Sequence, residues 1–406
     1  MKLQKTVNIL FMLCFLGFLF IGMAVTVVKP KDNASYFENR TLAAVPDLSR
    51  QSLWNGSWFS GWESYLKDHA AGRETLLKTA TYLDLFVIKR PVVNNIVVTD
   101  RLLLSYNAYK PVDLEEIAED SQKMTDSLET FNQIVAENGG VFYYVAVPGQ
   151  TAYFSGDYPA YLNSQAAFTA AALASFKADM SSRGLKLIDM GDVFDAMGRP
   201  AGMFSSTDHH YTFDGAFATY RTIMERLNTD DRLALPILSP DDITVKTVEN
   251  PFIGSRGREI FNMLPTDEKL KIAVLKKDIP FTRTDDGKDG APQVYALPQN
   301  TWDTVSYTVY MGGDVGETVI KTDRPDLPNV LICGDSYTNA VETLLYTGFN
   351  EMRSLDLRSY TAGSLADYVR DYKPDVVILL RDYSVLLSSD GNGNVLTIPG
   401  GEYNAH

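Results

Sequence analysis

The pattern of apolar and polar residues along the chain predicts an α/β fold. Short, unbroken apolar runs, which are typical of strands covered on both faces, alternate with longer segments of helical periodicity. Strands are expected at residues 141–148, 185–189, 330–333, 354–357 and 375–380. Amphipathic helices are expected at residues 112–138, 164–183, 214–226, 337–346 and 365–372, with Asp214 as a candidate N-cap of the third. This strand–helix–strand order predicts a parallel sheet with helices on both faces.

Three regions depart from this alternation. Residues 95–105 predict a pair of short strands around an Asp-Arg turn. Residues 228–328 are polar and rich in Thr, Asp and Pro, and we expect a β-rich insertion there, with short strands at 307–310 and 318–321. Residues 53–90 predict a long helix whose aromatic side chains recur at three- and four-residue spacing. Its apolar face is expected to pack on the main domain, and a sugar-binding aromatic face is the alternative.

The N-terminal segment is apolar enough to interact with a membrane. Residues 6–28 are long enough, at about 1.5 Å per residue, to cross a bilayer as a helix. Lysines flank the segment on both sides, so the positive-inside rule gives little information about which end of the helix faces the cytoplasm. We expect an uncleaved anchor at residues 1–28 with the bulk of the chain outside the cell membrane, and a cleaved signal peptide is the alternative. A stalk and helical region at 29–94 and an α/β domain at 95–406 complete the predicted organisation.

Composition narrows the possible partners. The chain has 406 residues, enough for a large core, and a formal net charge of -14. This charge argues against a nucleic-acid partner, because binding to phosphates needs clustered Lys and Arg. The two cysteines, Cys14 and Cys333, lie in the apolar N-terminal segment and in a predicted buried strand, so we expect neither a disulfide framework nor a zinc site.

One short segment concentrates residues that carry chemistry. Two of the four histidines of the chain stand side by side at 209–210, directly after Asp208. A carboxylate two residues before a histidine can hold the imidazole of His210 in one tautomer and stabilise the imidazolium form. A metal-ligand set is the alternative, but no further cluster of His or Cys supports it.

A candidate nucleophile lies much later in the chain. In the segment 330–339, a predicted strand leads into Gly334, Asp335 and Ser336, and a helix follows. The serine oxygen would lie near free backbone N–H groups and the positive end of the helix dipole, which can stabilise an oxyanion. Serine also needs an adjacent base, and His210 is the candidate. Both segments lie at carboxyl ends of strands, so we expect them to meet, although a simple tight turn capped by Asp or Ser is the alternative.

Residues 207–216 resemble the signature of the DHHW proteins, which belong with the SGNH-hydrolase-like proteins of bacterial alginate O-acetylation. In that group an Asp-x-His element precedes a Gly-Asp-Ser element, a circularly permuted order relative to ordinary SGNH esterases, and Asp208, His210 and Ser336 match it. Further matching segments are 38–42, 68–73, 147–148, 312–314 and 355–360. The resemblance implies a flavodoxin-like α/β domain behind a transmembrane anchor.

The sequence departs from this family at two points. Tyr211 replaces the tryptophan of the family name, and the Gly and Asn oxyanion blocks of ordinary SGNH enzymes have no clear counterpart. Candidate groups for substrate binding or for the oxyanion are His209, Tyr211, Asn339, Arg358, Tyr360 and Arg381.

The resemblance implies an extracytoplasmic O-acetyltransferase that modifies a cell-surface polysaccharide through an acetyl-serine intermediate. A membrane-bound O-acyltransferase is the implied partner that supplies the acetyl group, and no cofactor is expected. Two alternatives stay open. One is a carbohydrate esterase that uses the same residues with water as the acceptor. The other is a non-catalytic protein that binds polysaccharide or acts as a scaffold in an acylation complex.

Overall fold

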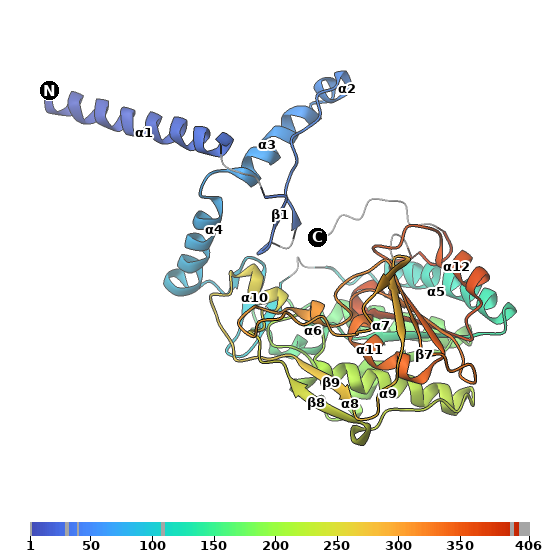
Figure 1. Ribbon diagram of the computed structural model, residues 1–406. Helices are drawn as coiled ribbons and strands as arrows, with labels where there is room; N and C mark the ends of the chain where they lie inside the picture. The colour runs from blue at the N-terminus through green and yellow to red at the C-terminus, as the bar shows by residue number, and fades with distance from the viewer. Residues whose placement is uncertain (1, 29–31, 39, 107–109, 390–393, 398–406) are drawn as a thin grey trace. The chain divides into compact units, whose positions relative to one another are not determined.

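An eight-stranded sheet forms the centre of the larger part of the chain (Figure 1). In sheet order, its strands are β11 (Lys288–Gly290), β10 (Thr282–Asp285), β12 (Glu317–Lys321), β14 (Glu351–Asp356), β13 (Val330–Gly334), β15 (Val376–Asp382), β6 (Val141–Val147) and β7 (Leu187–Asp189). The strands from β14 to β7 pair in parallel, whereas β10, β11 and β12 pair antiparallel. The predicted α/β fold is confirmed, and all five strands expected from the apolar runs are present.

This computed structural model describes residues 2–28, 32–38, 40–106, 110–389 and 394–397. It divides into two compact units, of which the first comprises Met1–Asn94 and Gly257–Pro265. The second comprises Asn95–Arg256 and the chain from Thr266 onward, and it contains the whole eight-stranded sheet.

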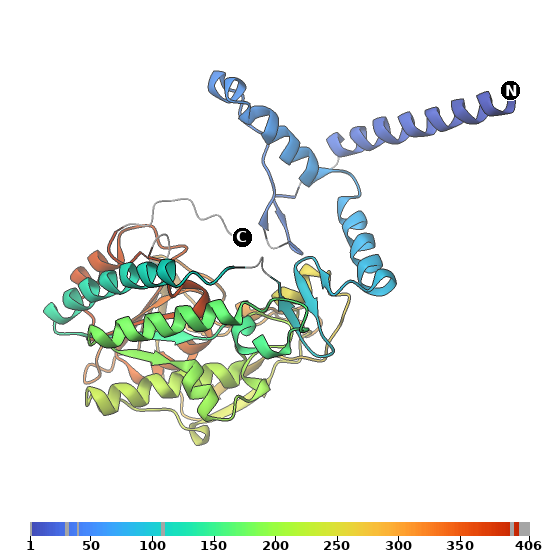
Figure 2. The ribbon, with the colours of Figure 1, turned by 180° about the vertical axis from the view of Figure 1, so that it is seen from behind.

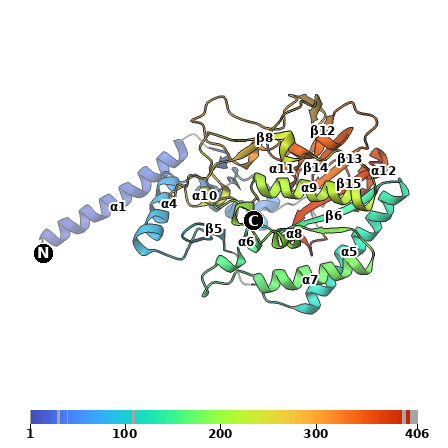
Figure 3. The same cartoon turned by 90° about the horizontal axis from the view of Figure 1, so that it is seen from below.

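Helices cover both faces of the sheet. One face carries α5 (Leu114–Glu137), α7 (Ala166–Ser182) and α12 (Leu365–Tyr372), and the first two lie side by side in Figure 2. The other face, towards the viewer in Figure 3, carries α9 (Phe213–Asp230) and α11 (Tyr337–Leu345). The remaining helices of this unit are short: α6 (Gln150–Tyr153), α8 (Met190–Ala196) and α10 (Ser255–Glu259), the last of which continues into the first unit.

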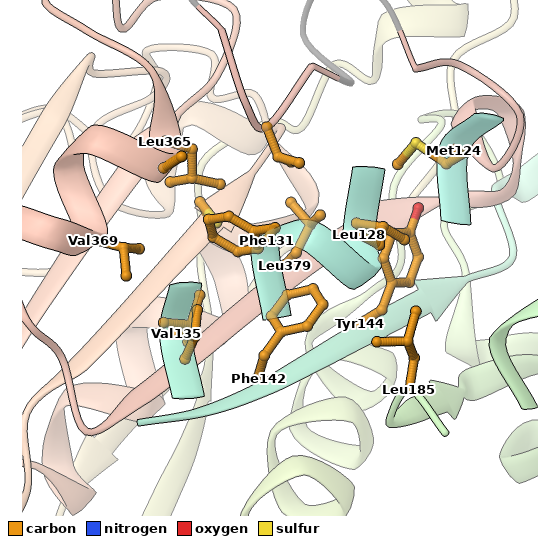
Figure 4. Packing of buried hydrophobic residues seen from close by; sticks show 14 of the residues in the cluster. Met124, Leu128, Phe131, Val135, Phe142, Tyr144, Leu185, Leu365, Val369 and Leu379 are labelled. Carbon is orange, nitrogen blue, oxygen red and sulfur yellow. The ribbon is translucent and has the colours of Figure 1, made fainter. Parts of the chain in front are cut away.

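One large hydrophobic cluster lies between the sheet and the layer formed by α5, α7 and α12. Side chains of α5, α7 and α12 pack against β6 and β15, with Phe131, Phe142 and Tyr144 fully or almost fully buried (Figure 4). Burying one such side chain stabilises the fold by about 1.5–3 kcal/mol. Because the neighbouring positions of β6 and β15 are buried against the opposite layer, these strands show no polar alternation in the sequence.

The insertion at 228–328 extends the central sheet. Its strand β12 pairs antiparallel with β14, and β10 and β11 continue the sheet outwards. The expected strand at 318–321 is therefore confirmed, but the one at 307–310 is wrong, because Tyr307–Val309 is a 3-10 turn. Tyr and Val favour strands in general, but here the ring of Tyr307 is stacked on the imidazole of His210. The insertion also contributes the antiparallel pair β8 (Ile243–Thr247) and β9 (Lys271–Leu275).

Two local expectations are corrected and one is confirmed. Thr212, and not Asp214, is the N-cap of α9, because its side chain accepts a hydrogen bond from Gly215 N.

The single long helix expected at 53–90 is instead α2 (Arg50–Trp54), α3 (Ser57–His69), α4 (Arg73–Tyr82) and a π-helical turn at Leu83–Ile88. Gly56 and Gly72 separate the helices, since both adopt left-handed backbone angles, with φ of 82° and 75°. The hairpin expected at 95–105 is present as β4 (Ile96–Val98) and β5 (Leu103–Ser105).

The first unit begins with the apolar helix α1 (Lys2–Val28). Its segment Gln4–Thr26 is long and apolar enough to cross a membrane, as an anchor or as a signal sequence. Short strands β1 (Ala34–Ser35), β2 (Arg40–Thr41) and β3 (Val92–Val93) belong to the same unit. On α3, the rings of Trp58, Trp62 and Tyr65 contact one another edge-to-face. A sugar-binding role for this aromatic face stays a prediction.

Candidate active site

Three polar side chains form a continuous hydrogen-bonded chain in the second unit. His210 Nδ1 lies 2.6 Å from Asp208 Oδ1, and His210 Nε2 lies 2.7 Å from Ser336 Oγ. All three residues are buried, with 2 % of Asp208, 4 % of His210 and 8 % of Ser336 exposed. The structure therefore brings together the two sequence segments that were expected to meet, although 126 positions separate the histidine from the serine.

The loop that carries Asp208 and His210 is held from several directions. Glu268 accepts hydrogen bonds from the backbone N–H and the hydroxyl groups of both Ser206 and Thr207, at 2.7–3.1 Å. Ser205 Oγ accepts from Asp208 N at 2.9 Å, and Gln150 Nε2 donates to Ser205 O at 2.8 Å. This network holds the backbone of the loop that carries Asp208 and His210.

A second segment supports the carboxylate from the opposite side. Ser255 N donates to Asp208 Oδ2 at 2.7 Å, so both oxygens of the carboxylate accept hydrogen bonds. The backbone of Gly254 approaches Thr207 so closely that a Cβ at position 254 would lie 2.2 Å from Thr207 O. Glycine is therefore needed at 254 for Ser255 to reach Asp208.

Ser336 lies where β13 passes into α11. The turn needs Gly334, because a Cβ there would lie 2.0 Å from Leu380 O on the neighbouring strand β15. Helix α11 begins directly after Ser336, which directs the positive end of its dipole towards the serine. The Tyr337 hydroxyl donates to His209 O, and the Tyr211 hydroxyl donates to Tyr337 O, so hydrogen bonds in both directions join the segment of His210 to that of Ser336.

Aromatic rings enclose the imidazole of His210. Tyr307 stacks on it at a centroid distance of 3.7 Å with only 4° between the planes, and His209 lies against it at 3.7 Å. His209 Nδ1 contacts Ser255 Oγ at 2.8 Å. Stacking on one side and packing on the other leave the imidazole one orientation, with its edges directed at Asp208 and Ser336.

The electrostatics of the loop favour a charged aspartate and a neutral second histidine. Burial by itself would raise the pKa of Asp208, but His210, His209 and the hydrogen bond from Ser255 hold it well below its usual value. Burial, together with the neighbouring charge of His210, lowers the pKa of His209 well below its usual value. Asp208 is thus ionised, and His209 is an uncharged imidazole at neutral pH.

The pKa of the Asp335 carboxyl group, next to Ser336, is raised, whereas that of Asp208 is lowered. Burial and the nearby charge of Asp382 raise its pKa to about 6, although Arg381 opposes the shift. Its Oδ1 accepts a hydrogen bond from Tyr337 N at 3.0 Å, which helps to set the start of α11.

The residues expected to bind an oxyanion do not all lie in one place. Asn339 Nδ2 donates to Asp314 Oδ1 at 3.2 Å, and Arg358 pairs with Asp314 at 2.9 Å and with Asp356. Tyr360 instead lines a separate cavity of about 450 Å³, together with Tyr368 and Tyr372.

Arg381, the last of these candidates, is fully buried on β15. Its charge acts on the neighbouring Asp335 and Tyr144. The structure therefore joins Asn339 and Arg358 through Asp314 and places Arg381 beside Asp335, whereas Tyr360 lies at the other cavity.

A metal site was the alternative for the Asp-His-His segment. Ligand-type atoms of Asp208, His209 and His210 do lie within 4.8 Å of one another. However, both ring nitrogens of His210 are already at hydrogen-bonding distance from Asp208 and Ser336. A metal ligand needs a free lone pair on one of those nitrogens, so this donor set fits a proton-transfer chain better than a metal.

Three supporting residues were not predicted from the sequence: Ser255, Tyr307 and Glu268. All three come from the polar insertion, 46 or more positions after the residues that they contact, and nothing in their local pattern connects them to the loop. The pair Gly254-Ser255 is the only available signal, because a glycine beside a serine can mark a close backbone approach.

Comparison with known proteins supports the fold. No protein-family model and no curated protein sequence matches the chain. Among solved structures, PatB1 from Bacillus cereus with a sulfonyl adduct has a TM-score of 0.60 at 23% identity, covering 74% of this chain and 98% of its own. A DHHW family protein from Eubacterium siraeum has a TM-score of 0.55 at 18% identity, covering 73% and 93%. The chain therefore shares the fold of these proteins, and its expected resemblance to the DHHW proteins is confirmed at the level of the fold.

Proposed function

We propose that this protein is an O-acetyltransferase that uses Ser336 as nucleophile, His210 as general base and Asp208 as the group that orients His210. The observation that carries the proposal is the unbroken contact from Asp208 through His210 to Ser336 in a buried site. A serine hydroxyl becomes a useful nucleophile when a base is placed in this way. The positive end of α11 is available to stabilise the oxyanion.

The proposed reaction has two halves. Ser336 Oγ attacks the carbonyl carbon of an acetyl donor while His210 takes its proton, and the protonated His210 then donates to the leaving group. An acetyl-serine results. A hydroxyl group of a polysaccharide next attacks the acetyl carbon, and His210 transfers the proton from that hydroxyl to Ser336 Oγ. Asp208 stays ionised throughout and stabilises the imidazolium.

We further propose that α1 anchors the protein in the cell membrane, with the active site on the extracytoplasmic side. The support is the apolar segment Gln4–Thr26. A membrane-bound O-acyltransferase would then supply acetyl groups, and a cell-surface polysaccharide would accept them. A carbohydrate esterase would use the same residues with water as acceptor. The buried, aligned triad argues against a purely scaffolding role.

A covalent label tests the nucleophile directly. Because PatB1 has been solved with a sulfonyl adduct, we expect a sulfonyl fluoride to modify this chain at Ser336. Peptide mapping should find the label on Ser336 in the wild type and no label at that position in His210→Gln, where the base is removed. Labelling of other serines at a rate equal to that of Ser336 would contradict an activated nucleophile.

A further inference from the structure

A polar cavity of about 420 Å³ adjoins the triad in the second unit. It lies at the carboxyl ends of β6 and β15, where Gln150 and Asp382 contribute to its lining. Ligands of open α/β sheets bind at this edge, and the volume falls within the roughly 300–1,000 Å³ of small-molecule sites. His209 and Tyr337 also line the cavity, and their rings lie 3.7 Å and 5.0 Å from the ring of His210.

A buried amide oxygen in this lining has no partner in the described part of the chain. Gln150 is 1 % exposed, and its Nε2 donates to Ser205 O, which fixes the orientation of the amide. Its Oε1 is buried and accepts no hydrogen bond from any described residue. Buried carbonyl oxygens are almost always satisfied in folded proteins, so this one indicates that a donor is supplied from outside.

A buried amide nitrogen in the same lining has no acceptor in the described part of the chain. Asn163 Oδ1 accepts from Gln165 N at 2.9 Å, which fixes its orientation in turn. Its Nδ2 is buried and donates to none of the residues that the structure describes. The lining thus offers one unused acceptor and one unused donor, both on side chains held in place by other contacts.

A ligand with hydroxyl groups meets both requirements, because each hydroxyl donates one hydrogen bond and accepts others. The rest of the lining has the same mixed character. It includes the polar residues Ser164, Gln165 and Thr169 and the aromatic residues Tyr158 and Phe168. A sugar ring presents hydroxyl groups at its edge and apolar C–H groups on its faces, which suit such a wall.

We propose that this cavity binds the sugar residue that accepts the acetyl group, an assignment that rests on the proposed function. A hydroxyl oxygen of the bound sugar attacks the acetyl carbon of acetyl-Ser336. A new ester bond forms as the Ser336 Oγ–carbon bond breaks, and His210 carries the sugar proton to Ser336 Oγ. Gln150 and Asn163 hold the other hydroxyl groups and thereby position the sugar.

Asn163→Asp tests the assignment with a change of a single group. An aspartate keeps the acceptor for Gln165 N but replaces the unused donor by a second acceptor. Asn55→Asp is the matched control: Asn55 is exposed, does not line the cavity, and its side-chain oxygen likewise accepts a backbone hydrogen bond, from Ser57 N at 3.0 Å. The two half-reactions are measured separately, with p-nitrophenyl acetate as donor and methyl glucoside as the probe acceptor.

We expect Asn163→Asp to form acetyl-enzyme at the wild-type rate and to lose at least about tenfold in the acceleration of deacetylation by methyl glucoside. The control should match the wild type in both steps. Equal acetyl transfer to methyl glucoside by Asn163→Asp and by the wild type would overturn the assignment. So would a wild-type acetyl-enzyme whose deacetylation methyl glucoside does not accelerate. An equal loss of rate in acetylation and in deacetylation by Asn163→Asp would overturn it as well. Absence of acetyl-enzyme in the wild type would instead refute the proposed function and the inference with it.

Discussion

Tyr307 contacts His210 through its ring, and we expect its hydroxyl group to be dispensable. The ring stacks on the imidazole, whereas the hydroxyl is buried and has no hydrogen-bond partner among the described residues. We therefore expect Tyr307→Phe to retain activity and stability. Tyr307→Ala should lower kcat about tenfold, because the imidazole gains freedom, and should destabilise the fold by about 3–5 kcal/mol. Ester hydrolysis and thermal unfolding measure the two effects, and equal losses in both variants would contradict this role.

Asp335 is expected to reduce stability as the pH rises. Its folded-state pKa of about 6 exceeds the roughly 3.9 of an unfolded aspartate, so the unfolded state ionises first. The contribution of this carboxyl group is fully present below about pH 4 and is lost as the pH rises through about 6. Asp335→Asn removes the ionisation and preserves the acceptor for Tyr337 N.

We predict that Asp335→Asn is more stable than the wild type by about 1–3 kcal/mol at neutral pH and shows much less advantage near pH 4. Urea denaturation at the two pH values gives both differences. An advantage that does not depend on pH would contradict a raised pKa of Asp335 in the folded protein.

At the scale of elements, the active site depends on close approaches between segments. Gly254→Ala would place a Cβ 2.2 Å from Thr207 O, so the loop carrying Asp208 must move. We expect kcat to fall by about one to two orders of magnitude, since small misplacements of catalytic groups are costly. Gly202→Ala is the control, because a Cβ there meets nothing within 4 Å. If both variants kept full activity, the approach of Gly254 would not be needed for the site.

The elements that could be predicted from sequence are those with local causes. Strands β6, β13 and β15 appear as unbroken apolar runs, and Asp208 and His210 are two positions apart. The break at Gly56 was missed because Trp54 and Trp58 continue the aromatic spacing across it, and the break at Gly72 was missed because a single glycine is tolerated within a helical pattern. The stacking of Tyr307 and the hydrogen bond from Ser255 were also missed, because contacts between distant segments leave no periodic trace.

At the scale of the whole molecule, α1 is a candidate membrane anchor. A helix as apolar as Gln4–Thr26 gains more free energy from a bilayer than from water. We expect the full-length chain to fractionate with membranes and to resist extraction by high salt, and a chain starting at residue 32 to be soluble. N-terminal sequencing of the mature protein separates an anchor from a cleaved signal peptide, and an N-terminus downstream of residue 24 would contradict the anchor.

The acetyl-serine intermediate is the central claim, and the mass of the intact protein tests it most directly. Wild type and Ser336→Ala are incubated with a small acetyl ester, quenched in acid and weighed. The triad geometry predicts a gain of one acetyl group on the wild type, located at Ser336 by peptide mapping, and no gain on the variant. An acetyl group on both proteins, or turnover of the ester by Ser336→Ala at the wild-type rate, would contradict the account.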